Sequence, residues 1–159
     1  MSLHFGVDVG TSSVRVALFD RSGLLIDHRV KEILVHHPQA DFYEQSSENI
    51  WIAICECFHQ ILAESNPRID PKRIKSIGFD ATCSLVVLDS QFKPVTVDPL
   101  KKDDSLNVIM WMDHRAKKQA ESINKTNHER LRSVGGSYHL IPFLKYFRKN
   151  LNDLFNKKS

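Results

Sequence analysis

The sequence predicts a mixed α/β fold in which an antiparallel three-strand meander leads into a long helix and then into strands alternating with helices. Three observations support this fold class. Residues 3–35 contain three apolar strand patterns separated by two tight turns. Residues 46–64 repeat apolar side chains at helical spacing. Beyond Pro71, short apolar runs alternate with helical patterns to about residue 133. We therefore expect a mixed sheet with flanking helices.

The meander comes first along the chain. Strands are expected at residues 3–9, 14–19 and 24–35, because each is an apolar run bounded by turn residues. The intervening turns at 10–13 and 20–23 are rich in glycine, serine and aspartate, which close hairpins. Consecutive short connections of this kind predict antiparallel neighbours.

The long helix is the clearest local pattern. Ser46 or Ser47 can cap its first turn, and we expect it to run to about Glu64, where Asn66 and Pro67 end it. Its apolar residues share one face of the helix: Trp51, Ile54, Cys55, Phe58, Ile61 and Leu62.

The remaining elements are shorter. We expect strands at 74–79, 84–88 and 108–111 and a loop at 91–106. A helix is expected at 114–124, with Asp113 as its cap. A second helix is expected at 127–133, and it stops at Gly135 and Gly136. A last segment places Leu144, Phe147, Leu151 and Leu154 at helical spacing.

Composition sets limits on the function. The 159 residues are 42% hydrophobic and 26% charged, which is ordinary for a globular domain and excludes a disordered or fibrous chain. No apolar run is long enough to span a bilayer, and the first residues lack a signal-peptide pattern. Three cysteines favour reduced thiols and a cytoplasmic location. We expect no membrane partner.

Charge is unevenly distributed. Residues 1–90 hold 8 basic and 12 acidic side chains, whereas residues 91–159 hold 14 basic and 7 acidic ones. A nucleic-acid-binding surface could have this composition, but the basic residues are scattered and no aromatic side chains interleave them. Solvated helix faces explain them better, so we expect no nucleic-acid partner.

The turn at 10–13 is the first candidate site. It follows Asp8 at the end of one strand and precedes Arg15 on the next. Phosphate oxygens can accept hydrogen bonds from the hydroxyls of Thr11 and Ser12, from main-chain amides in a glycine turn and from the forked guanidinium of Arg15. The carboxylate of Asp8 can hold hydrated Mg²⁺. Taken alone, the motif favours a plain hairpin turn with a surface ion pair. The P-loop and Rossmann glycine patterns are both absent.

Two further motifs follow strands. Residues 79–84, Phe-Asp-Ala-Thr-Cys-Ser, could line a ligand site or simply connect two strands. Residues 111–115, Trp-Met-Asp-His-Arg, offer a flat apolar wall for a sugar and a carboxylate for its hydroxyls. The plain alternative for this second motif is a core tryptophan followed by a helix cap.

Tyr43-Glu44-Gln45 stands between the first and second of these motifs. Taken together, the motifs resemble the start of the FGGY carbohydrate kinases, above all the ribulokinase-like members. The resemblance covers residues 3–136. The resemblance implies a ribonuclease-H-like (actin-like ATPase) half-domain that uses ATP and Mg²⁺ to phosphorylate a ketose, such as a D-ribulose-like pentulose. It implies phosphate contacts by Gly10, Thr11, Ser12 and Arg15, a Mg²⁺ role for Asp8, and sugar contacts by Cys83, Trp111 and Asp113.

The same resemblance implies a shortened chain. Family kinases are longer, with a catalytic-base aspartate and a second domain after the part matched here. We therefore expect residues 1–136 to be the N-terminal part of the first domain and residues 137–159 to be a divergent helical tail. We also expect the chain alone to be inactive.

The alternative is a non-catalytic interaction module that associates with a full-length kinase through an uncovered surface. A different actin-like ATPase would share the first loop, but Tyr43-Glu44-Gln45 and the motif at 111–115 argue against it.

Overall fold

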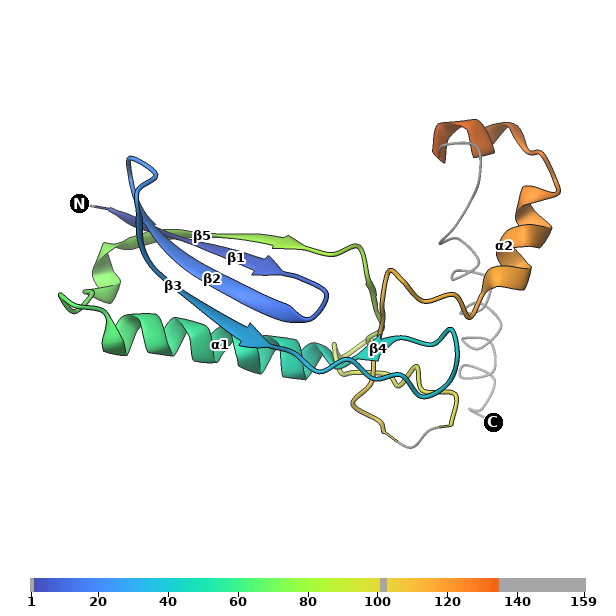
Figure 1. Ribbon diagram of the computed structural model, residues 1–159, viewed down its shortest axis with the longest axis horizontal. Helices are drawn as coiled ribbons and strands as arrows, with labels where there is room; N and C mark the ends of the chain where they lie inside the picture. The colour runs from blue at the N-terminus through green and yellow to red at the C-terminus, as the bar shows by residue number, and fades with distance from the viewer. Residues whose placement is uncertain (1, 101–102, 135–159) are drawn as a thin grey trace. The chain divides into compact units, whose positions relative to one another are not determined.

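The computed structural model describes residues 2–100 and 103–134 (Figure 1). It divides into two compact units, one spanning residues 1–111 and one that begins at Met112. The elements of the first unit, in chain order, are β1 (Leu3–Val9), β2 (Ser13–Asp20), β3 (Leu25–Glu32), β4 (Glu44–Gln45), α1 (Ser47–Glu64), the 3₁₀ turn η1 (Pro71–Arg73), β5 (Ile74–Ala81), β6 (Leu85–Val86) and β7 (Val108–Ile109). The second unit holds α2 (Lys117–Asn124) and the 3₁₀ helix η2 (Glu129–Val134).

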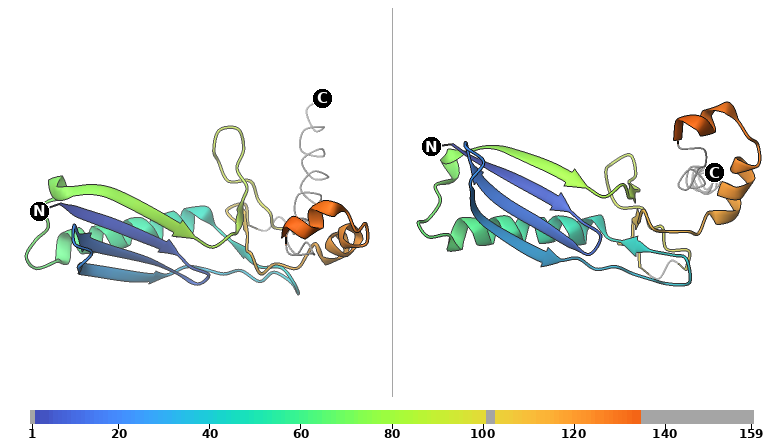
Figure 2. Two further views of the ribbon diagram at one scale, coloured as in Figure 1. Left: turned by 90° about the horizontal axis from the view of Figure 1, so that it is seen from above. Right: turned by 45° about the horizontal axis from the view of Figure 1, so that its top comes forward.

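The larger sheet has the strand order β3-β2-β1-β5 (Figure 2). β1 pairs with β2, and β2 with β3, in antiparallel fashion, which confirms the predicted meander. β5 returns after α1 and pairs with β1 in parallel, so the sheet is mixed. Helix α1 lies along one face of this sheet, mainly against β2 and β3.

The core fills the space between α1 and the sheet. Alternate residues of β1 face the helix, and Phe5 meets Phe58 of α1 edge-to-face with ring centroids 4.5 Å apart. This core consists of Leu3, Phe5, Val7, Val14, Val16, Leu18, Ile33, Ala53, Ile54, Cys57, Ile61 and Ile69. The period-two pattern of the strands and the helical period of α1 thus bury a common apolar layer.

The ends of α1 agree with the sequence prediction. Ser46 is the N-cap, and its hydroxyl accepts a hydrogen bond from the backbone N–H of Asn49 at 3.3 Å. At the other end the Ser65 hydroxyl donates to the Ile61 carbonyl at 2.6 Å. Within the described part of the chain, no helix is long and apolar enough to cross a membrane.

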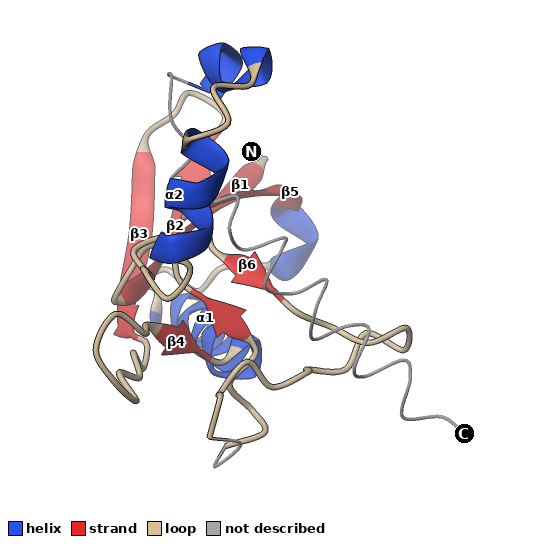
Figure 3. Ribbon diagram, turned by 90° about the vertical axis from the view of Figure 1, so that its right-hand side faces the viewer, coloured by secondary structure: helices blue, strands red, loops and turns tan. Residues whose placement is uncertain are grey.

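A second, smaller sheet has the order β4-β7-β6, with both pairings antiparallel (Figure 3). The predicted strands at 84–88 and 108–111 are shorter in the structure and belong to this sheet. Their partner β4 was not predicted, because two residues carry no periodic pattern. Pairing between Gln45 and Val108 brings together segments that lie far apart in the sequence.

The second unit corrects one prediction. α2 begins at Lys117 rather than at residue 114, and its N-cap is Ala116, which makes no capping side-chain bond. Asp113 was expected to cap this helix, but its carboxylate accepts from Arg115 instead. The helix expected at 127–133 is the 3₁₀ helix η2. The boundary at residue 136 and the helical pattern from Leu144 lie outside the described residues.

Candidate functional site

The loop between β1 and β2 is held in place on both sides. The Gly10 N–H donates to the Ser13 carbonyl at 2.9 Å, and the carbonyl of Ser12 accepts from the Ile33 N–H at 3.0 Å. A Cβ atom on Gly10 would lie 3.1 Å from both the Ser13 carbonyl oxygen and a guanidinium nitrogen of Arg15. Glycine is therefore favoured here, because a larger residue would force these atoms to move apart.

Asp8 and Arg15 form an ion pair beside this loop. They are directly opposite each other across β1 and β2, and Nη1 of Arg15 donates to Oδ2 of Asp8 at 2.8 Å. Both side chains are about half exposed, at 51% and 54%. A guanidinium has five N–H donors, so Arg15 can keep Asp8 and still offer donors to an anion.

A second carboxylate lies next to Asp8. In the parallel pairing of β1 with β5, Asp80 is the register partner of Asp8, and both side chains are exposed. Asp80 was not predicted as a site residue because the pairing of β1 with β5 could not be read from the sequence. The available signal was that both aspartates come near the end of an apolar strand and just before a turn of small residues.

The first two sequence motifs and Trp111 of the third meet in the first unit. The loop after β5 is joined to β1 by the Thr82 N–H, which donates to the Val9 carbonyl at 3.0 Å. Ser84 accepts from the Trp111 N–H through its hydroxyl at 3.3 Å. The Trp111 indole N–H in turn donates to the Thr11 hydroxyl at 3.1 Å. Cys83 is exposed on this loop as a free thiol.

Buried polar side chains support the loop from the small sheet. Gln45 donates through its side-chain amide to the Thr11 carbonyl at 3.0 Å. Asn107 is fully buried, accepts from the Ser47 N–H at 2.9 Å and donates to the Val87 carbonyl at 3.1 Å. The arrangement places hydroxyl, amide, carboxylate and guanidinium groups beside the Trp111 ring, and groups of these kinds can bind an anion or a hydroxylated ligand.

Comparison with known proteins shows the family of the chain. Residues 3–158 match the N-terminal domain of the FGGY family of carbohydrate kinases. The chain belongs to the FGGY family. An FGGY carbohydrate kinase domain-containing protein of Xenopus laevis is 46% identical over 94% of this chain, and a D-ribulokinase of Saccharomyces cerevisiae is 41% identical over 93%.

These relatives are much longer. The chain spans 27% of the Xenopus protein and 21% of the yeast protein. Among solved structures, the xyloylose kinase of Brucella ovis superposes on 97% of this chain and 30% of its own, with a TM-score of 0.72 at 21% identity. This likeness confirms the predicted actin-like ATPase fold.

Asp113 is a site residue predicted from the third motif. Asp113 belongs to the second unit, where its carboxylate accepts bidentate hydrogen bonds from Arg115 at 2.7–2.9 Å. Both side chains are 1% exposed. The carboxylate could reach a sugar hydroxyl only if these bonds to Arg115 rearranged.

Among the described residues, no group of three or more histidine, cysteine, aspartate or glutamate side chains is arranged to hold a metal ion. Two adjacent carboxylates nevertheless fit Mg²⁺, which keeps several waters and is held by one or two carboxylates together with substrate phosphates. Asp8 and Asp80 provide this donor set at the edge of the loop.

Proposed function

We propose that this chain forms the phosphate- and sugar-binding N-terminal part of an ATP-dependent kinase that phosphorylates a ketose, with D-ribulose as the favoured class member. The observation that carries the proposal is the meeting of the Asp8–Arg15 pair, the Thr11 loop and the Trp111 ring in one compact unit. The 41% identity to a yeast D-ribulokinase favours a pentulose over other sugars.

The proposed roles follow from the chemistry of each group. Main-chain amides and hydroxyls of Gly10, Thr11 and Ser12 bind phosphate oxygens, and Arg15 neutralises their charge. Asp8, with Asp80 beside it, would hold Mg²⁺, which neutralises charge on the phosphates.

On the sugar side, the Trp111 ring forms an apolar wall, and Cys83 lines the same site from the loop after β5. Asp113 would join after exchanging Arg115 for a sugar hydroxyl. The free thiols Cys55, Cys57 and Cys83 suit a reducing cytoplasm.

In the reaction, a sugar hydroxyl oxygen attacks the γ-phosphorus, the bond between that phosphorus and the ADP oxygen breaks, and the hydroxyl proton passes to a general base. We propose, from the family resemblance, that this base belongs to a part of the longer kinases outside the motifs matched here. For these 159 residues by themselves we therefore propose binding with little or no turnover, since a positioned base contributes about 10²–10⁴-fold.

Calorimetric titration with Mg·ATP and a coupled assay with D-ribulose, L-ribulose and D-xylulose test this proposal. Asp8→Asn should weaken Mg-dependent ATP binding by about 10–100-fold, the range seen when groups that support a metal are lost. Asp104→Asn, which changes an exposed carboxylate on a distant loop, is the matched control. Equal binding by both variants would contradict the site, and rapid turnover by the 159 residues would contradict binding without catalysis.

We propose as a second candidate a non-catalytic module that associates with a full-length kinase. It is supported by β5, which is an edge strand among the described strands and carries exposed Ile77 and Phe79. Ile77→Lys should abolish a mass shift in light scattering on mixing with the longer kinase. Val30→Lys on the opposite edge strand β3 should not. No mass shift with the unaltered chain would refute this module.

A further inference from the structure

Thr11 receives two hydrogen bonds from elements distant in the sequence. The indole Nε1 of Trp111 donates to its hydroxyl at 3.1 Å, and the amide Nε2 of Gln45 donates to its carbonyl at 3.0 Å. One bond fixes the side chain and the other fixes the backbone. Thr11 is thus clamped at two points in the middle of the proposed phosphate loop.

The first bond determines where the Thr11 hydroxyl hydrogen can go. An indole N–H is only a donor, so the Thr11 oxygen must accept this bond with a lone pair. Its own hydrogen is then directed away from the indole and is available to another acceptor. A phosphate oxygen above the loop is such an acceptor.

The two donors, Gln45 and Trp111, are both held by the small sheet. Gln45 is 2% exposed, belongs to β4, and its carbonyl accepts from the Asn107 N–H at 3.2 Å. Trp111 follows β7, the strand that pairs with β4, and the preceding Met110 N–H donates to the Tyr43 carbonyl at 3.0 Å. The distance between the two donors is therefore set by the small sheet.

We propose that Gln45 is a positioning residue and that the Thr11 clamp, formed by Gln45 and Trp111, couples the sugar side of the site to the phosphate side. Any ligand that stacks on the Trp111 ring restrains its indole, and the indole restrains the Thr11 hydroxyl. Coupling between two binding events is reciprocal, so each ligand raises the affinity for the other by the same factor. This inference rests on the proposed phosphate role of the Thr11 loop.

The clamp itself can be tested without any ligand. The chain has two tryptophans, and the indole of Trp51, on the exposed side of α1, is an internal reference. In ¹H–¹⁵N spectra, the Trp111 indole N–H should exchange with solvent up to about tenfold more slowly than that of Trp51, as expected for one neutral hydrogen bond. Equal exchange rates for the two indoles would overturn the clamp.

Variants test separately the two hydrogen bonds of the Thr11 clamp. Thr11→Val removes the hydroxyl at constant size and should abolish Trp111 protection, whereas Thr11→Ser should retain it. Gln45→Met removes the amide donor at similar volume and should speed Trp111 exchange about threefold, because the loop is no longer held under the indole. Gln60→Met, on the exposed side of α1, is the control. Unchanged Trp111 exchange in Gln45→Met would show that Gln45 does not position Thr11.

The coupling is tested by fluorescence in a Trp51→Phe background, in which Trp111 is the only tryptophan. D-Ribulose should tighten Mg·ADP binding about fivefold or more, and Gln45→Met should remove this factor while the fold is retained. Equal Mg·ADP affinity with and without sugar would overturn the coupling. If Mg·ADP does not bind at all, both the phosphate role of the Thr11 loop and the coupling are overturned. The exchange rates of the indole N–H groups would still show whether the Thr11 clamp exists.

Discussion

Two aspartate–arginine pairs in this protein have similar nitrogen–oxygen distances and opposite surroundings. Asp8 and Arg15 are 2.8 Å apart at the phosphate loop, with side chains 51% and 54% exposed. Asp113 and Arg115 are 2.7 Å apart in the second unit, with side chains 1% exposed. The buried pair is also bidentate, since Nε and Nη2 of Arg115 both donate to Asp113, whereas Nη1 of Arg15 donates to Asp8, so the pairs differ in burial and in bonding.

This difference separates a binding role from a structural role. An exposed ion pair contributes only about 0–1 kcal/mol, so the Asp8 carboxylate can exchange Arg15 for a metal or a water at little cost. A buried pair that loses one member leaves an uncompensated charge in a low-dielectric environment. The buried Asp113–Arg115 pair is therefore costly to separate, and a sugar contact by Asp113 stays a prediction.

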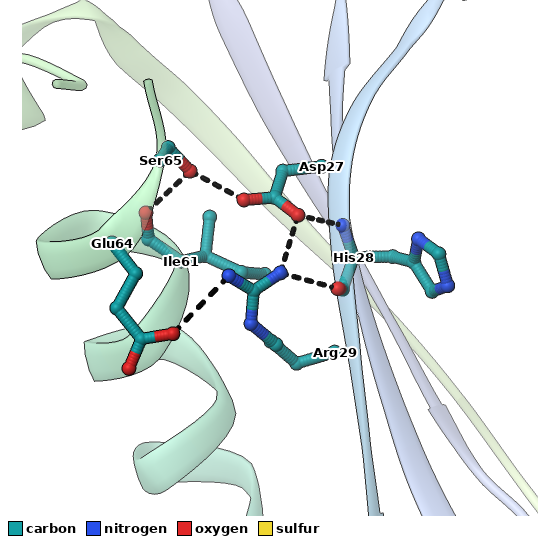
Figure 4. A network of polar contacts seen from close by, with 6 residues as sticks. All are labelled: Asp27, His28, Arg29, Ile61, Glu64 and Ser65. Carbon is teal, nitrogen blue, oxygen red and sulfur yellow. Dashed lines mark hydrogen bonds and ion pairs between the residues drawn. The ribbon is translucent and has the colours of Figure 1, made fainter. Parts of the chain in front are cut away.

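A third pair has intermediate burial. Arg29 donates to Asp27 at 2.5 Å, and their side chains are 27% and 18% exposed. Figure 4 shows the network around them, in which Asp27 also accepts from the Ser65 hydroxyl at 2.5 Å and Arg29 reaches Glu64 at 3.4 Å. These bonds join β3 to the end of α1. The three pairs form a graded series in exposure.

The largest effect is expected at the buried pair. Arg115→Met should lower the free energy of unfolding by about 3–5 kcal/mol, because Asp113 would be left charged and buried. Urea unfolding followed by circular dichroism measures this loss. Arg132→Met, which changes an exposed arginine of η2, should stay within about 0.5 kcal/mol of the parent chain. Equal stability of the two variants would show that burial does not determine the cost.

An intermediate effect is expected at Asp27. Burial alone would raise its pKa, but hydrogen bonds from Ser65, the His28 backbone and Arg29 outweigh burial and hold the pKa below its ordinary value of 3.8. Asp27→Asn should cost about 1–2 kcal/mol at pH 7, since it weakens bonds to a charged group.

The pH dependence of this loss identifies its cause. Because the folded-state pKa is lowered, the stabilisation is fully present above about pH 5 and is lost as the pH falls below 3.8 and through the folded-state value. Unfolding curves of parent and Asp27→Asn should therefore converge in acid. A stability difference that stays constant down to pH 2 would assign the loss to packing.

The smallest effect on stability is expected at the exposed pair. Arg15→Gln should change the free energy of unfolding by no more than about 1 kcal/mol, and the change should shrink further in 1 M salt. The same variant should weaken Mg·ATP binding measurably. A large loss of stability with unchanged ATP binding would reverse the roles assigned to the exposed and buried pairs.

Local patterns could be predicted from the sequence, and long-range pairings could not. The extent of α1 and its Ser46 cap depend on residues within one or two turns of each other, so periodicity and capping chemistry were sufficient. The hairpins of the meander depend on short turns in the same way. The family resemblance also pointed to the correct fold and to the loop at Thr11.

The missed features involve residues that meet only after folding. Asp80 joins Asp8 through a parallel pairing that spans the whole of α1, and Gln45 reaches Thr11 from a two-residue strand without periodicity. Asp113 was expected to cap a helix because aspartate before a helical pattern often does. The Asp113 carboxylate instead accepts from both the backbone N–H and the guanidinium of Arg115, which precedes α2, so it caps no turn of that helix.

The hydrogen bond from Trp111 to Thr11 also bears on how the protein is made. It joins residues 100 positions apart, whereas the bonds of the β1–β2 hairpin join close neighbours. Closing so long a loop has an entropic cost that local hairpins and helices do not share. As the chain leaves the ribosome, the meander and α1 can therefore form early, while the Thr11 loop must wait until Trp111 has emerged. The proposed phosphate site at the Thr11 loop should therefore be the last part of the first unit to form.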